Sequence, residues 1–168
     1  MSTTDFTLGQ AKSALAALEA ILKKGEASPN GASLPDARIV DDMLPLSFQV
    51  HVVTDTASKL VARLTGVDPT PFENNLKTFA DFYKRIETVN AILAGADAAA
   101  VEAGATRTVT FGMGPGKSVE TLGKNFVLGY ALPNIFFHTA TAYNIIRKNG
   151  VDVGKMDYLT PFIGPYMS

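Results

Sequence analysis

Four stretches of the chain carry apolar residues at alternating three- and four-residue steps, and this spacing constrains the fold more than any other feature. In the first stretch, from Thr7 to Lys24, the apolar positions are Leu8, Ala11, Leu15, Leu18 and Leu22. Such a period puts apolar side chains on one face of an α-helix. Further helices are expected from Pro45 to Gly66, from Phe72 to Leu93 and from Gly123 to Asn149. Four amphipathic helices predict an all-α, four-helix bundle, with residues 1–168 forming a single domain.

The period changes between the third and fourth helices. Residues 106–111 and 117–122 alternate polar and β-branched positions around the tight connection GMGPG, which predicts a small β-hairpin leaning on the bundle. A short helical turn is expected from Asp36 to Asp42. The last residues, VDVGKMDYLTPFIGPYMS, are too aromatic for a solvated end, so we expect them to pack back across the bundle.

Composition excludes several classes of partner. The chain has 15 basic and 16 acidic residues and a net charge of −1, so no electrostatic field favours nucleic acid or an anionic membrane. It has no cysteine, which removes disulfides, thiol nucleophiles and thiolate metal sites. Asp5, Lys12 and Glu19 interrupt the first apolar stretch, which therefore predicts a helix and not a signal peptide. No run of about 18 apolar residues occurs, and a cytoplasmic protein is expected.

A few polar residues point toward the expected core. At about 100° per residue, the inner face of the second helix contains Leu46, Val50, Val53, Ala57, Leu60 and Leu64. Asp42 and Gln49 project close to this direction, whereas His51 falls on the opposite side. In the last helix His138 lies on the inner stripe, with Asn134 and Thr141 along its edge. If the two faces meet, Asp42, Gln49, Asn134, His138 and Thr141 form a polar cluster inside the bundle.

Two interpretations of this cluster remain open. The first is a hydrogen-bond network that fixes helix register, with His138 neutral. The second is a ligand pocket or a metal site, which bundles commonly build between helices. In a catalytic site without metal, His138 would be the general acid or base, because it is the inward group with an ordinary pKa near neutrality. Gln49 and Asn134 would then orient a substrate, and Asp42 would set the tautomer of the histidine.

Three blocks of sequence resemble an uncharacterised domain-of-unknown-function family of the DinB/YfiT-like superfamily. The pattern D-M-x-P-L-x-x-Q matches Asp42 to Gln49, and P-N-x-x-F-H-x-x-x-A-Y matches Pro133 to Tyr143. A third pattern, G-V-x-x-G-K-x-D-[FY]-L, matches Gly150 to Leu159. The resemblance implies a DinB-like four-helix bundle in a superfamily of metal- or thiol-linked enzymes.

The resemblance also implies a metal site that this chain only partly reproduces. Better-known members of the superfamily hold a divalent metal with one histidine on the second helix and an H-x-x-x-H pair on the last helix. His138 matches the first histidine of that pair, but Ala142 occupies the second position and cannot be a ligand. On the second helix, Gln49 and not His51 points in the direction expected for the histidine ligand. His138 is therefore the candidate ligand of Zn²⁺ or Ni²⁺, with Asp42 and water completing a looser site.

Other motifs add little. The chain has no G-x-S-x-G pattern, and GMGPGK lacks the spacing of a phosphate-binding loop. Three functions are therefore compared: a small-molecule-binding or degenerate DinB-like bundle, which we favour, a metal-dependent hydrolase or transferase, and a homodimer without catalytic activity. The homodimer would form through apolar surfaces of the tail and of the second helix, where the exposed positions are Leu44, Phe48, Val52 and Ala62.

Overall fold

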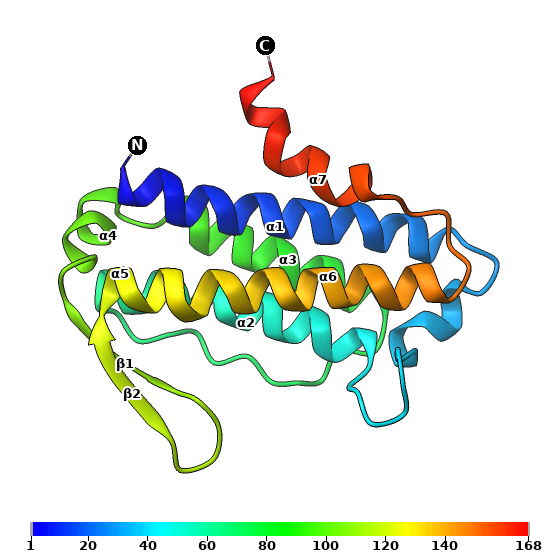
Figure 1. The fold of residues 1–168 in the computed structure, drawn as a ribbon, viewed down its shortest axis with the longest axis horizontal. Helices are drawn as coiled ribbons and strands as arrows, with labels where there is room; N and C mark the ends of the chain where they lie inside the picture. The colour runs from blue at the N-terminus through cyan, green and yellow to red at the C-terminus, as the bar shows by residue number, and fades with distance from the viewer. Residues whose placement is uncertain (1, 168) are drawn as a thin grey trace.

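The computed structural model describes residues 2–167 and confirms an all-α bundle with a small β-hairpin (Figure 1). The long helices α1, α2, α3 and α6 lie alongside one another. Their bounds are Thr3–Glu26, Leu46–Thr65, Phe79–Ala94 and Leu132–Lys148. Shorter elements are the 3₁₀ helix η1 (Gly31–Asp36), α4 (Ala98–Gly104), α7 (Lys155–Ile163) and the 3₁₀ turn η3 (Gly164–Tyr166).

The hairpin is where it was expected, between α3 and the last long helix. Strand β1 (Thr108–Gly112) pairs antiparallel with β2 (Ser118–Leu122), with Thr110 opposite Glu120. Val109 and Phe111 of β1 are buried, whereas the alternate residues of that strand are exposed. The hairpin thus leans on the bundle through one side of β1.

Local sequence fixes the helix ends. Ser2 and Asp5 form a capping box at the start of α1, and Thr78 and Asp81 form another at the start of α3. Helix α2 ends at Gly66, which has φ 78°, a left-handed conformation that glycine adopts without a Cβ penalty. These signals explain where α1 and α3 begin and where α2 ends.

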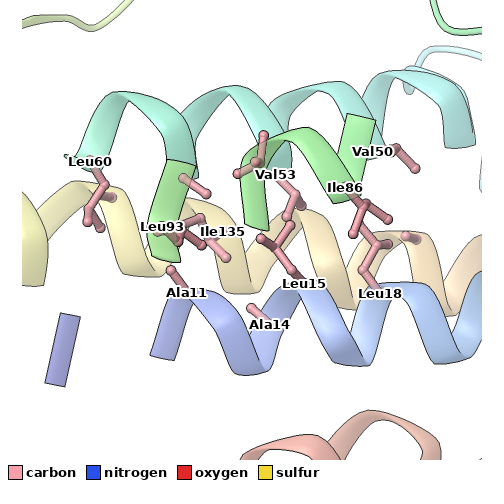
Figure 2. Packing of buried hydrophobic residues seen from close by; sticks show 14 of the residues in the cluster. Ala11, Ala14, Leu15, Leu18, Val50, Val53, Leu60, Ile86, Leu93 and Ile135 are labelled. Atoms are coloured by element: carbon pink, nitrogen blue, oxygen red, sulfur yellow. The ribbon is translucent and has the colours of Figure 1, made fainter. Parts of the chain in front are cut away.

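The core lies between the four long helices (Figure 2). Leu15 and Leu18 of α1 meet Val53 of α2 and Ile86 of α3 there, and each of these four side chains is at most 1% exposed. All six residues predicted for the inner face of α2 are fully buried. Periodicity alone therefore identified the buried face of this helix.

Pro133 lies inside a continuous helical segment and changes its geometry. The segment runs through α5 (Gly123–Phe126), the π-helical turn η2 (Val127–Ala131) and α6. Proline has no N–H, and its ring collides with the carbonyl four residues earlier. In the wider turn of η2, the N–H of Leu132 donates to the carbonyl of Val127. The helix thus accommodates Pro133 with one wider, π-helical turn and does not end there.

Two predictions about local structure were wrong. Helix α3 begins at Phe79 and not at Phe72, because the Thr78 cap starts the helix there and the preceding prolines favour an extended chain. The helical turn expected from Asp36 to Asp42 is also absent, since η1 lies earlier and ends at Asp36.

The tail returns to the bundle as predicted, and α7 lies against α1 (Figure 1). Lys24 of α1 forms an ion pair with Asp157 of α7 at 2.8 Å, and the rings of Phe136 and Phe162 pack edge to face. Within residues 2–167, no helix has both the length and the hydropathy needed to cross a bilayer.

Candidate functional site

The inner faces of α2 and α6 meet, and a hydrogen bond joins Gln49 to His138. Nδ1 of His138 lies 2.7 Å from Oε1 of Gln49. The Nε2 amide group of Gln49 donates to the carbonyls of Leu44, at 2.9 Å, and Pro45, at 3.3 Å. Gln49 is only 3% exposed, so the bundle contains this amide with all of its polar atoms partnered.

This arrangement selects one tautomer of His138. The amide nitrogen of Gln49 faces two carbonyl oxygens, so its oxygen must face the imidazole and accept a hydrogen bond. Nδ1 of His138 therefore carries the proton, and Nε2 carries the lone pair. Within residues 2–167 Nε2 has no hydrogen-bond partner, and it is not among the fully buried unpaired atoms.

The surroundings of His138 keep it neutral. Burial lowers the pKa of His138 from 6.5 to about 4, because the charged imidazolium is poorly solvated there. The rings of Phe48 and Phe137 pack against the imidazole, with centroid distances of 6.1 and 5.1 Å. At neutral pH this histidine is therefore a hydrogen-bond donor at Nδ1 and an acceptor at Nε2.

The other residues of the predicted cluster do not join the Gln49–His138 pair. Asn134 is one turn before His138, and its Nδ2 donates to Oγ1 of Thr56 on α2 at 3.0 Å. Thr141 is buried, but its hydroxyl donates to the carbonyl of Phe137 on its own helix at 2.7 Å. The inward placement of Asp42 was wrong: α2 begins only at Leu46, and Asp42 is exposed in the preceding loop. The α2–α6 contact thus has two polar pairs, Gln49–His138 and Thr56–Asn134.

His51 lies away from the inner face, as predicted, but it is half-buried and its Nδ1 is fully buried without a partner in residues 2–167. Desolvation lowers the pKa of His51, and the positive charge of Arg85 on α3 adds to that effect against the opposing charge of Asp55. His51 thus lies on the side of α2 that faces α3 and takes no part in the contact with α6.

A divalent metal does not fit the donors present. Within the described residues, 2–167, no three His, Asp or Glu side chains are grouped to hold a metal ion. Ala142, in the position of the second histidine, is fully buried in the core. The side-chain oxygen of Gln49 is already bonded to His138. We therefore assign no chemical step to a metal.

A cavity of about 160 Å³ lies beyond the Thr56–Asn134 pair and was not foreseen from the sequence. Thr56 lines it together with Asp55, Lys59 and Arg63 of α2. The facing wall consists of Phe111 of β1, Phe126 of α5 and Tyr130 of η2. The three rings touch, with centroid distances of 4.6 to 6.0 Å. The π-helical turn caused by Pro133 thus contributes the tyrosine of an aromatic wall, and such turns are frequent at functional sites.

The sequence contained one signal for this cavity. Asp55, Lys59 and Arg63 recur every four residues and therefore lie along one side of α2. Asp55 and Lys59 form an ion pair at 2.6 Å, while the Nε atom of Arg63 donates to the carbonyl of Thr110 on β1 at 3.0 Å. The aromatic wall had no comparable signal, because it exists only after the hairpin docks.

The apolar surface predicted on the second helix is mostly covered. Ala62 is 4% exposed, and Phe48 and Val52 are half-buried. Leu44, before α2, remains 47% exposed. Exposed apolar side chains also occur on α7, which has no buried residue and exposes Met156, Leu159 and Ile163.

Comparisons with known proteins agree with this fold. The sequence model of a domain of unknown function, DUF1993, matches residues 4–159. A crystal structure of a DinB family member protein from Shewanella denitrificans is similar, with a TM-score of 0.83 and 36% sequence identity. The similarity covers 93% of this chain and 90% of that chain. No curated protein sequence matches.

Proposed function

We propose that this chain, which belongs to the DUF1993 family and has a DinB-like fold, binds a small organic molecule without a resident metal. The binding site is the cavity between α2, β1 and η2. One observation carries the proposal: the cavity has an aromatic wall on one side and charged and hydroxyl groups on the other. Small-molecule sites combine apolar and aromatic side chains with a few convergent polar groups that fix the orientation of the ligand.

Thr56 connects the cavity to the predicted polar cluster. Its hydroxyl accepts a hydrogen bond from Asn134 and donates to no group within residues 2–167. Thr56 is 6% exposed and lines the cavity, so a ligand acceptor in the cavity would satisfy this hydroxyl proton. Asn134 therefore acts on the ligand through Thr56, as a positioning residue.

The Gln49–His138 bond holds the walls in place in this proposal. It fixes the register of α2 against α6, which also fixes where Thr56 and Asn134 meet. With a pKa of about 4, His138 is uncharged at neutral pH, and we assign it no proton transfer. Thr141 and Asp42 have no role in the site.

A fragment screen against ¹⁵N-labelled protein tests the proposal. We expect uncharged or charged ring-sized fragments to shift the amide resonances of residues 55–63, 111–112 and 126–130 in a saturable way. Thr56→Val removes the hydroxyl with little change of shape and also removes the acceptor of Asn134, and it should weaken fragments that carry a hydrogen-bond acceptor severalfold. Thr65→Val is the matched control, because the Thr65 hydroxyl donates to Val61 within α2 and lies outside the cavity. A screen in which no fragment shifts these resonances would overturn the proposal.

A further inference from the structure

Arg63 is a cation without a counterion at the edge of the cavity. Its Nε donates to Thr110, and its guanidinium lies over the ring of Phe126 at 5.9 Å from the centroid. Within residues 2–167 no carboxylate forms an ion pair with it, whereas Lys59 is paired with Asp55. The guanidinium is therefore held in position by the hairpin, with its two terminal nitrogens unused.

The charge of the cavity lining is unbalanced. Two cations, Lys59 and Arg63, and one carboxylate, Asp55, line it. Because Asp55 and Lys59 neutralise each other, the remaining positive charge is that of Arg63. A half-buried guanidinium beside three aromatic rings is less screened than one in bulk water, so an anion close to it is bound more strongly.

We propose that the ligand is a small carboxylate with a flat, ring-sized apolar body, and that Arg63 binds its carboxylate. This inference rests on the function proposed above. The apolar body packs against Phe111, Phe126 and Tyr130, and the hydroxyl of Thr56 is available to an acceptor elsewhere on the ligand. A guanidinium presents two parallel N–H groups that match the two oxygens of a carboxylate.

The size of the cavity sets the size of the ligand. A volume of about 160 Å³ is close to that of an apolar protein cavity of about 150 Å³ that holds benzene. One ring therefore fills the recess, and the carboxylate extends toward Arg63 at its edge. A second ring would extend outside the recess.

Benzoate and benzamide are the probes, because they share shape and differ in charge. Titrations of ¹⁵N-labelled protein at low salt should show benzoate binding at the cavity about tenfold more tightly than benzamide, the size of effect expected for one charge-assisted pair. In Arg63→Gln the two affinities should become equal. Arg63→Lys should retain part of the preference, since it keeps the charge but loses the paired N–H geometry. Arg147→Gln, at the last turn of α6, is the matched control and should leave both affinities unchanged.

The outcomes separate the two proposals. Equal binding of benzoate and benzamide at the cavity would overturn the carboxylate assignment and leave small-molecule binding intact. If neither probe nor any fragment shifts the cavity resonances, both proposals fall. If Arg63→Gln does not fold, a salt titration of the wild-type protein replaces it. The preference for benzoate should decline as the NaCl concentration rises. An unchanged preference would contradict the role of Arg63.

Discussion

His138 on α6 and Gln49 on α2 are 89 residues apart in sequence, yet Nδ1 of one lies 2.7 Å from Oε1 of the other. The remaining polar group of Gln49 is held by two backbone carbonyls before and at the start of α2. The bond thus links α6 to the N-terminal end of α2. A change in helix register would break it and leave buried polar atoms unpaired, which costs about 1–3 kcal/mol.

A double-mutant cycle measures this link. Gln49→Leu and His138→Leu should each lower the free energy of unfolding by about 1–3 kcal/mol, because each leaves the other partner unsatisfied. The double variant should lose less than the sum, with a coupling energy of about 1 kcal/mol in denaturant titrations. Gln49→Leu combined with Thr88→Ala, an exposed position on α3, should be additive. If the effects of Gln49→Leu and His138→Leu on the free energy of unfolding were additive, the bond would not stabilise the fold.

Stability should fall on acidification between about pH 6.5 and 4. The folded pKa of His138 is about 4, below its ordinary value of 6.5, so in this range the unfolded chain binds more protons than the folded one. The stabilisation is complete above about pH 6.5 and is lost as pH falls to 4. Because the ring is partly exposed, the loss should be about 1 kcal/mol. The lowered pKa of His51 acts in the same direction.

Denaturant titrations from pH 7 to 4.5 check this dependence, and ring ¹⁵N spectra check its cause. His138 should be neutral at pH 7 with its proton on Nδ1. His138→Gln should flatten its part of the pH dependence, and His51→Gln should flatten the rest. Asp81, whose pKa is lowered by hydrogen bonds from the backbone of Lys77 and from Thr78, contributes only at lower pH. Stability that does not change over this range would contradict the neutral state.

The parts of the fold that could be predicted depend on local interactions, and the parts that could not depend on contacts between residues far apart in the sequence. The helices and the facing of Gln49 and His138 follow from a 3.6-residue period, which is local and could be seen in the sequence. Asp42 was misplaced because the helical wheel was extended past Pro45, the residue at which α2 is capped. The error came from missing the signal at which the helix begins, and not from the helical period.

The cavity depends on long-range contacts and could not be predicted. Its walls come from α2, the hairpin and the π-helical turn, and the Arg63–Thr110 bond that joins two of them spans 47 residues. The sequence shows Pro133, but both a kinked helix and a widened turn accommodate a proline. Only the packed structure shows that the widened turn presents Tyr130 to Phe111.

The homodimer expected from the sequence remains a prediction, and α7 is where it can be tested. Met156 is 58% exposed and Ile163 43% exposed on this helix. Sedimentation equilibrium at micromolar concentration should give a dimeric mass, and Met156→Glu with Ile163→Glu should shift it to a monomer. Val67→Glu changes an apolar residue that is 61% exposed outside α7, and it should leave the mass unchanged. A monomeric wild-type protein would refute the expected dimer.

Gly104, the last residue of α4, allows α4 to contact the end of α2, next to the cavity wall. A Cβ on Gly104 would overlap the carbonyl oxygen of Leu64, and a Cβ on Gly123 would overlap the carbonyl oxygen of Gly104. Both clashes are with backbone, which cannot rotate away as a side chain can. Gly104→Ala should therefore lower the free energy of unfolding by about 2–4 kcal/mol and displace α5, which carries Phe126 of the aromatic wall.

Gly129→Ala is the matched control for this variant. A Cβ on Gly129 would meet nothing within 4 Å, and its φ is not positive. This variant should be neutral or stabilise the protein by up to about 1 kcal/mol, because alanine loses less backbone entropy in a helix. Denaturant midpoints of the two variants give the comparison. If Gly104→Ala were as stable as Gly129→Ala, the backbone contact between α4 and α2 would have to be looser than the structure shows, and the position of α5 would not depend on it.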